Sequence, residues 1–164
     1  MHSAVGISAG HGGEDVNENE SLQASSVVSY VVKAAMPETD AKVFSFPAQK
    51  TMYGGKNIAA EDEIFLFASE NEGGRGLIAL GVVTAAARAP TVRGAGGRGT
   101  PRVSITVRRI ASAKRSLGRN ELKSFRDWGD GRPQTELCFK LYRQATNKVV
   151  GITQETAAFL RTLF

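Results

Sequence analysis

The chain has 164 residues, a length that fits one domain, and 41% of them are hydrophobic, which is enough to bury a sizeable core. Its single cysteine, Cys138, excludes a disulfide framework. The first residues lack the basic start and apolar run of a secretory signal, and no stretch approaches the roughly 18 apolar residues of a membrane span. We therefore expect a soluble, cytoplasmic protein.

Charge is distributed unevenly along the chain. Residues 1–87 hold 5 Lys and Arg against 11 Asp and Glu, whereas residues 88–164 hold 16 against 5. Clustered Arg and Lys side chains bind polyanions with a gain in affinity, because they release the counterions condensed on phosphates. The basic half therefore indicates nucleic acid as a partner, with an ordinary solvated charged surface as the alternative.

Residues 1–24 are rich in Gly, Ser and acidic residues and poor in large apolar ones. Such a segment buries too little surface to offset the entropy of ordering it, so we predict a disordered N-terminal tail. The tail contains both histidines, His2 and His11. Residues 25–164 are predicted to form a single domain.

The first half of this domain contains one ambiguous segment and one short one. Residues 26–35 have apolar positions at helical spacing, but their β-branched and aromatic content favours a strand. Residues 43–46 are expected to form a short extended piece that ends at Pro47. A polar connection is predicted over residues 48–60.

Two apolar strands follow. Residues 63–69 and 76–87 are apolar on both faces, as expected of strands inside a sheet or barrel, and a Gly-rich turn between them predicts an antiparallel hairpin. Gly81 indicates a bulge or a close backbone approach in the second strand. Residues 90–101, rich in Gly and Arg, are predicted to be a flexible basic loop.

The C-terminal half is predicted to combine strands with short helices. Residues 102–110 alternate between apolar and polar, and residues 136–142 alternate in the same way, so both are predicted to be strands. Residues 117–127 are expected to form a short helix or turn, and residues 147–151 a last strand. A closing helix is predicted to begin after Thr153, a favourable N-cap residue.

Several kinds of catalytic site lack the residues they need. Both histidines lie in the predicted tail, which disfavours a Ser–His–Asp or Cys–His site, and one cysteine with two tail histidines does not supply a zinc site. Cys138 is expected to be a packing residue. The acidic run at residues 61–63 is expected to be solvated. The Gly-rich residues 94–99 match no phosphate-binding loop. We expect no metal and no cofactor.

Two motifs resemble a known family. The stretch EDEIFLFAS at residues 61–69, a Gly-bearing turn, and GLIALGVV at residues 76–83 are similar to the EVE domain of the PUA-like superfamily. Tyr30 resembles the aromatic residue of that family's first strand, and the stretch GIT at residues 151–153 resembles its end. The resemblance implies a small α+β, β-rich pseudo-barrel of five to six mostly antiparallel strands, with short helices including a C-terminal helix.

The resemblance also implies a pocket that holds an extruded base between aromatic walls, because an aromatic surface restores the stacking that such a base has lost. Tyr30 and Ser69 match family positions, whereas Ala68 stands where the family usually has His. Aromatic side chains in or beside loops and cations of the basic half complete the candidates. The predicted base pocket is Tyr30, Phe46, Tyr53, Ser69 and Trp128, and the predicted phosphate contacts are Lys56, Arg102, Arg108, Arg109 and Arg132.

We therefore predict a nucleic-acid-binding module that recognises a modified or extruded base in DNA or RNA and is not an enzyme. Two alternatives stay open. PUA-like folds include nucleases of the ASCH type, and a metal-free nuclease acting on RNA could use Lys56, Tyr53 and arginines. A basic face could instead meet an acidic protein partner.

Overall fold

A computed structural model of the chain describes residues 29–89, 102–144 and 147–164. The predicted tail over residues 1–24 and the predicted loop over residues 90–101 lie outside the described residues. Within them, no helix is long and apolar enough to cross a membrane.

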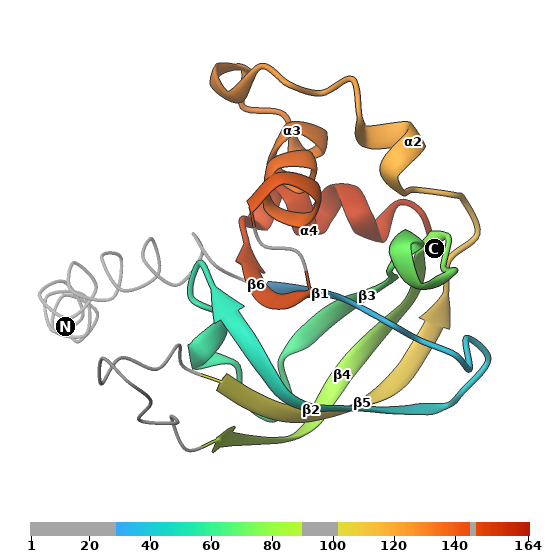
Figure 1. Cartoon of the computed structure of the whole chain (residues 1–164), viewed down its shortest axis with the longest axis vertical. Helices are drawn as coiled ribbons and strands as arrows, with labels where there is room; N and C mark the ends of the chain where they lie inside the picture. The colour runs from blue at the N-terminus through green and yellow to red at the C-terminus, as the bar shows by residue number, and fades with distance from the viewer. Residues whose placement is uncertain (1–28, 90–101, 145–146) are drawn as a thin grey trace, which may run out of the picture.

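Six strands close into a barrel in the order β1-β3-β4-β5-β2-β6 (Figure 1). Four of the neighbouring pairs are antiparallel, and the pairs β1–β3 and β2–β6 are parallel. The mostly antiparallel β-rich barrel is therefore confirmed, as is a strand rather than a helix at the first segment. The strands are β1 (Ser29–Ala34), β2 (Val43–Met52), β3 (Glu63–Ala68), β4 (Gly76–Ala89), β5 (Arg102–Ser112) and β6 (Lys148–Ile152).

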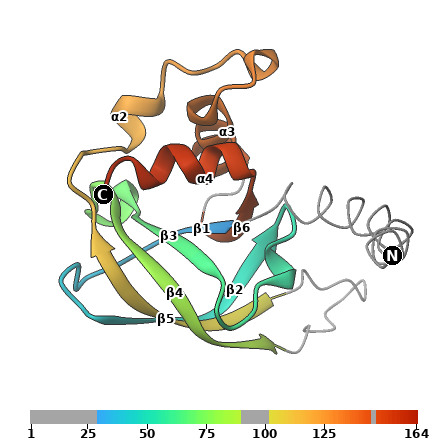
Figure 2. The ribbon, with the colours of Figure 1, turned by 180° about the vertical axis from the view of Figure 1, so that it is seen from behind.

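The three α-helices found among the described residues lie together on one side of the barrel, over β1, β3 and β6 (Figures 1 and 2). The predicted C-terminal helix is confirmed, and its Thr153 side chain accepts a hydrogen bond from the Thr156 N–H. The helices are α2 (Arg119–Leu122), α3 (Pro133–Phe139) and α4 (Gln154–Arg161), with a π-helical segment η4 (Lys140–Gln144) directly after α3 and 3-10 turns η1 (Gly55–Asn57), η2 (Glu70–Glu72) and η3 (Trp128–Asp130).

Strand β3 is buried on both faces, as its sequence predicts. Ile64, Leu66 and Ala68 point into the barrel interior, whereas Phe65 and Phe67 point outward, and all five are fully buried. Burying each large apolar side chain is worth about 1.5–3 kcal/mol. The outer face of this part of the barrel therefore needs a cover, and the helical layer supplies it through Leu122, Leu137, Leu141, Ala157 and Leu160.

The expectation that the second extended piece ends at Pro47 is wrong, because β2 continues to Met52. Proline lacks an N–H for the ladder and is tolerated in strands at bulges. The pairing of β2 with β5 shifts register between Phe46 and Gln49, and Ala48 has a positive φ of 49°. The bulge carries the strand past the proline, so the predicted polar connection begins only after Met52.

The strand predicted at residues 136–142 is also wrong, because α3 and η4 cover these residues. Pro133 stands in the first turn of α3, where its missing N–H costs nothing. Leu137 and Leu141 are four residues apart, so they share one helical face, and both are fully buried. Their spacing satisfies a strand pattern and a helix pattern equally well.

Gly81 lies at an irregularity in the pairing of β4 with β5, which confirms the predicted bulge and close approach. A Cβ at this position would lie 2.4 Å from Val107 Cγ1 and 2.9 Å from the Arg108 carbonyl oxygen. The glycine therefore lets β4 and β5 approach closely at this irregularity.

Gly76 and Gly73 form a matched pair for testing a second close approach. Both have φ near +90°, but a Cβ on Gly76 would lie 2.4 Å from the Leu117 carbonyl oxygen, whereas a Cβ on Gly73 has nothing within 4 Å. Gly73→Ala is expected to lower the free energy of unfolding by about 1–2 kcal/mol, the usual cost of the left-handed backbone. Gly76→Ala is expected to lower it further, as measured by urea denaturation. Equal losses of unfolding free energy in the two variants would contradict a close approach of Leu117 to Gly76.

Candidate nucleic-acid interface

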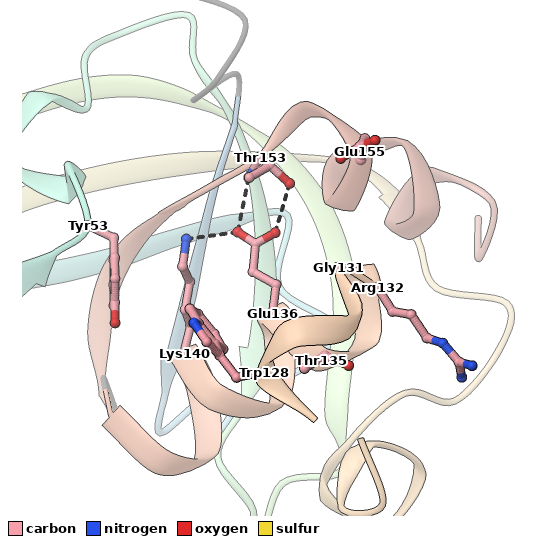
Figure 3. A pocket seen from close by; sticks show the side chains of 9 residues that line it. All are labelled: Tyr53, Trp128, Gly131, Arg132, Thr135, Glu136, Lys140, Thr153 and Glu155. Carbon is pink, nitrogen blue, oxygen red and sulfur yellow. Dashed lines mark hydrogen bonds and ion pairs between the residues drawn. The ribbon is translucent and has the colours of Figure 1, made fainter. Parts of the chain in front are cut away.

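A cavity of about 420 Å³ lies beside α3 (Figure 3). Its volume is within the range of small-molecule pockets. Side chains from the end of β2, from η3 and α3, and from the start of α4 meet around it, although they are far apart in the sequence. The cavity is lined by Tyr53, Trp128, Gly131, Arg132, Thr135, Glu136, Lys140, Thr153 and Glu155.

The polar floor of this cavity is an ion pair between Glu136 and Lys140. The Lys140 ammonium lies 2.8 Å from Glu136 Oε2, and the two side chains are only 10% and 13% exposed. Lys140 Nζ also donates to the Gly151 carbonyl oxygen at 2.9 Å. Figure 3 shows Lys140 and Thr153 converging on the Glu136 carboxylate. Since a buried charge is costly unless it is paired, these contacts explain how the floor is tolerated.

The Glu136 carboxylate accepts several further hydrogen bonds. The Thr153 hydroxyl donates to it at 2.7 Å, the Thr153 N–H at 3.1 Å, and the Thr156 hydroxyl donates to it as well. Burial by itself raises the pKa of Glu136, but hydrogen bonds from Lys140, Thr156 and Thr153, together with the Lys140 charge, lower it below its ordinary value. The carboxylate is therefore ionised and fully engaged, which makes it a poor proton acceptor.

Tyr53 and Trp128 supply the aromatic surface of the cavity. Tyr53 is 39% exposed and has a positive φ of 52°, and its hydroxyl donates to the Gln144 side chain. The Lys140 ammonium lies 4.5 Å from the centre of its ring. Trp128 is 56% exposed, and its indole packs edge-on against Phe139 with the ring centres 4.8 Å apart. Two partly exposed rings thus border one hollow.

Arg132 is the third predicted site residue at this cavity. Its N–H donates to Asp130 Oδ1 at 2.9 Å, and its guanidinium lies 3.9 Å from Asp130 Oδ2. The side chain is 63% exposed and points away from the other labelled side chains in Figure 3. It therefore adds positive charge to the rim and not to the floor.

The other predicted pocket residues lie elsewhere. Tyr30 and Phe46 are part of the barrel interior and only 7% and 5% exposed. Burial, with the nearby Asp62 charge, raises the pKa of Tyr30. Ser69 is buried at the start of η2, and its Oγ has no hydrogen-bond partner in the part of the chain that the structure describes. None of the three lines the cavity beside α3, so their role in a base pocket stays a prediction.

The predicted phosphate contacts are scattered over the barrel. Arg102 donates to the Ala48 carbonyl oxygen at 3.0 Å, and Arg109 donates to the carbonyl oxygens of Ala41 and Thr39 and to Ser112 Oγ. Arg108 and Lys56 are exposed. Two of these cations thus hold the backbone in place, and the role of all four toward phosphates stays a prediction.

Sequence reasoning missed Glu136 and Lys140. Their i,i+4 spacing is the signal of a helical ion pair, but it is meaningful only once the segment is known to be a helix. Cys138 is buried as expected, although in a helix and not in a strand, and burial raises the pKa of its thiol. Among the described residues, no group of three or more His, Cys, Asp or Glu side chains is placed to hold a metal ion.

Comparison with known proteins identifies the fold. No protein-family model matches the chain, and no curated protein matches it significantly. Among solved structures, the chain is similar to human THYN1 in complex with 5-methylcytosine-containing DNA, with a TM-score of 0.56 and 15% identity over 82% of this chain and 96% of that one. The chain is similar to the DUF55 domain of human thymocyte nuclear protein 1 as well. The TM-score is 0.56 and the identity 16%, over 82% of this chain and 97% of that one.

A bacterial protein gives the same result. The chain is similar to a protein from Pseudomonas putida with a TM-score of 0.53 and 16% identity, over 82% of this chain and 98% of that one. At this level of identity the likeness establishes the fold. The small β-rich barrel of mostly antiparallel strands with short helices, expected from the sequence, is therefore confirmed as a fold.

Glu136→Gln tests the buried network. Because the folded pKa of Glu136 is lowered, its carboxylate stabilises the fold above the unfolded pKa, about 4.3, and loses this contribution as the pH falls through the folded value. Removing the charge is expected to cost about 1–3 kcal/mol at pH 7. The difference from the wild type should shrink below pH 4, as measured by urea denaturation across pH. A pH-independent difference would contradict the lowered pKa.

Proposed function

We propose that the chain is a nucleic-acid-binding module whose cavity beside α3 receives an unstacked base. The observation that carries this proposal is that Tyr53 and Trp128, two partly exposed aromatic side chains, line one cavity whose buried charges are already paired. A base that leaves its stack regains stacking energy on such rings, at about 1–3 kcal/mol per base. Because Glu136 and Lys140 are already paired and hydrogen-bonded, the faces of the aromatic rings are the main surface that the cavity offers to a ligand.

The fold supports DNA as the first ligand to test. Human THYN1, whose fold the chain shares, was crystallised in complex with 5-methylcytosine-containing DNA. A shared fold does not by itself carry a function, so the argument for this chain depends on its own cavity. A mainly apolar, aromatic wall suits a base that carries a methyl group, and this motivates a modified base as the target.

The chemistry of the cavity favours binding over hydrolysis. A nuclease of the ASCH type would need a base or a nucleophile that faces the substrate. Glu136 is held by Lys140 and two threonines, and the Tyr53 hydroxyl donates to Gln144. Lys56, the other candidate for that reaction, does not line the cavity. Incubation of the protein with labelled RNA tests this alternative, since cleavage would contradict a purely binding role.

Trp128→Ala is expected to weaken binding to a single-stranded oligonucleotide by roughly 5- to 100-fold, the equivalent of about 1–3 kcal/mol for one lost stacking contact. Since the side chain is 56% exposed, the free energy of unfolding should change little. The matched control is Ile110→Ala, which removes a 54%-exposed side chain from β5 outside the cavity and should leave affinity unchanged.

Fluorescence anisotropy with a labelled oligonucleotide measures both variants. If Ser69→Ala lowers the affinity for the oligonucleotide and Trp128→Ala does not, the base binds beside the buried serine of the family motif and not in the cavity beside α3. No binding by the wild type to DNA or RNA at low salt would overturn the proposed function, and would favour a protein-interaction module.

The chain has one tryptophan, so its emission reports on Trp128 alone. Stacking of a base on the indole is expected to quench this emission as oligonucleotide is added. Titration with two oligonucleotides that differ only in cytosine or 5-methylcytosine measures preference for the methyl group, which is expected to bind tighter. Binding without any change in emission would show that the base does not reach the indole.

A further inference from the structure

A second cavity, of about 470 Å³, lies on the other side of α3. It is formed by α2, the segment that follows α2, and the α3–η4 helix. Four of its six lining residues carry positive charge and none carries negative charge. The lining residues are Arg119, Lys123, Arg126, Cys138, Tyr142 and Arg143.

The positive charge of this cavity is not balanced by ion pairs. The salt bridges found among residues 29–89, 102–144 and 147–164 join Arg132 to Asp130, Lys140 to Glu136 and Arg161 to Glu63. Within these ranges, none of the four cations of the second cavity takes part in one. Gathering like charges around one hollow costs Coulomb energy, which a bound anion would recover.

Within the described residues, most hydrogen-bond donors of these arginines have no protein partner. Each guanidinium has five N–H groups. Arg119 uses one to donate to Asn71 Oδ1 at 2.8 Å, and Arg126 uses one to donate to the Lys123 carbonyl oxygen at 3.2 Å. The Arg143 guanidinium lies over the Phe139 ring, 4.9 Å from its centre. A planar guanidinium group with free N–H donors can donate two parallel hydrogen bonds to two oxygens of a phosphate.

The Glu70 carboxylate contacts two residues of this cavity. Glu70 accepts hydrogen bonds from the Tyr142 hydroxyl at 3.0 Å and from the Arg119 N–H at 2.8 Å. Burial and the charge of Glu70 raise the pKa of Tyr142, so this residue is neutral, and its hydroxyl is engaged by Glu70. Glu70 and Glu121 line a neighbouring cavity that shares Arg119 with the cationic one. The cationic cavity itself has no acidic lining residue, so its lining is net positive.

Phe139 connects the two cavities. Its ring packs against Trp128 of the aromatic cavity at 4.8 Å and lies under Arg143 of the cationic cavity at 4.9 Å. One side chain therefore separates the Trp128 indole of the aromatic cavity from the Arg143 guanidinium of the cationic cavity. A strand of a few nucleotides is long enough to reach both, so one ligand that carries bases and phosphates fits the two surfaces.

We infer that the cationic cavity binds phosphodiester groups of the strand whose base enters the aromatic cavity. This inference rests on the proposed function and deepens it. It assigns the phosphate contacts to Arg119, Lys123, Arg126 and Arg143, in place of the arginines on β5 that the sequence suggested. Arg102 and Arg109 already donate to backbone carbonyl oxygens, so they have fewer donors left for a phosphate.

Arg126→Gln and Arg143→Gln test this assignment in the full chain. We expect each to weaken binding of a fluorescein-labelled ten-nucleotide thymidine strand by about 3- to 10-fold and to lower the slope of log affinity against log salt by roughly 0.7, the value for one single-strand phosphate contact. Arg115→Gln, which removes an equally exposed charge outside both cavities, should change neither quantity. Thermal unfolding of each variant checks that the fold is intact.

The outcomes separate this inference from the proposed function. If the wild type binds the strand and all three variants lose affinity equally, the charge acts diffusely and the cavity assignment is overturned while nucleic-acid binding stands. If Arg108→Gln alone weakens binding, the phosphate contacts lie on β5 and the assignment is likewise overturned. If inorganic tripolyphosphate stabilises the wild type while the strand does not bind, the cavity serves a free polyphosphate, and both the inference and the proposed function fail.

Discussion

The structure depends on strands that are apolar on both faces. In β3, alternate side chains fill the barrel interior and the space outside the barrel, and β1 and β6 share this outer space through Val31, Val150 and Ile152. Exposing that second face to water would forfeit much of the hydrophobic stabilisation, so the C-terminal third of the chain must fold over it. The helical layer is therefore a consequence of the barrel's composition, and both cavities are hollows that this layer encloses.

The same layer brings a buried ion pair under the aromatic cavity. Glu136 on α3 and Lys140 at the start of η4 connect the helix to the Gly151 carbonyl oxygen of β6 and to the N-cap of α4, so one network joins the helical layer to a barrel strand. A buried charge pair is tolerated when its remaining hydrogen-bonding capacity is filled. This network fixes the position of the Glu136 carboxylate beside the cavity and holds it ionised, which is the basis for proposing a binding role.

Under the proposed function, the two cavities divide the work that nucleic-acid recognition requires. Contacts to phosphates set position and affinity, whereas contacts to bases carry discrimination. Tyr53 and Trp128 offer stacking surface on one side of α3, and four cations without an ion pair among the described residues surround a hollow on the other.

The sequence by itself determined the strands whose period-2 pattern and apolar content have one interpretation, the bulge at Gly81, and the C-terminal helix after Thr153. It did not distinguish helix from strand at residues 136–142, because Leu137 and Leu141 satisfy both periods. Because the segment was predicted to be a strand, the i,i+4 ion pair of Glu136 and Lys140 was not predicted. It also did not separate buried from exposed aromatic residues. Tyr30 and Phe46 point into the barrel while Tyr53 and Trp128 border a cavity. Only tertiary structure decides this, because burial depends on which faces meet when the barrel closes and the helices cover it.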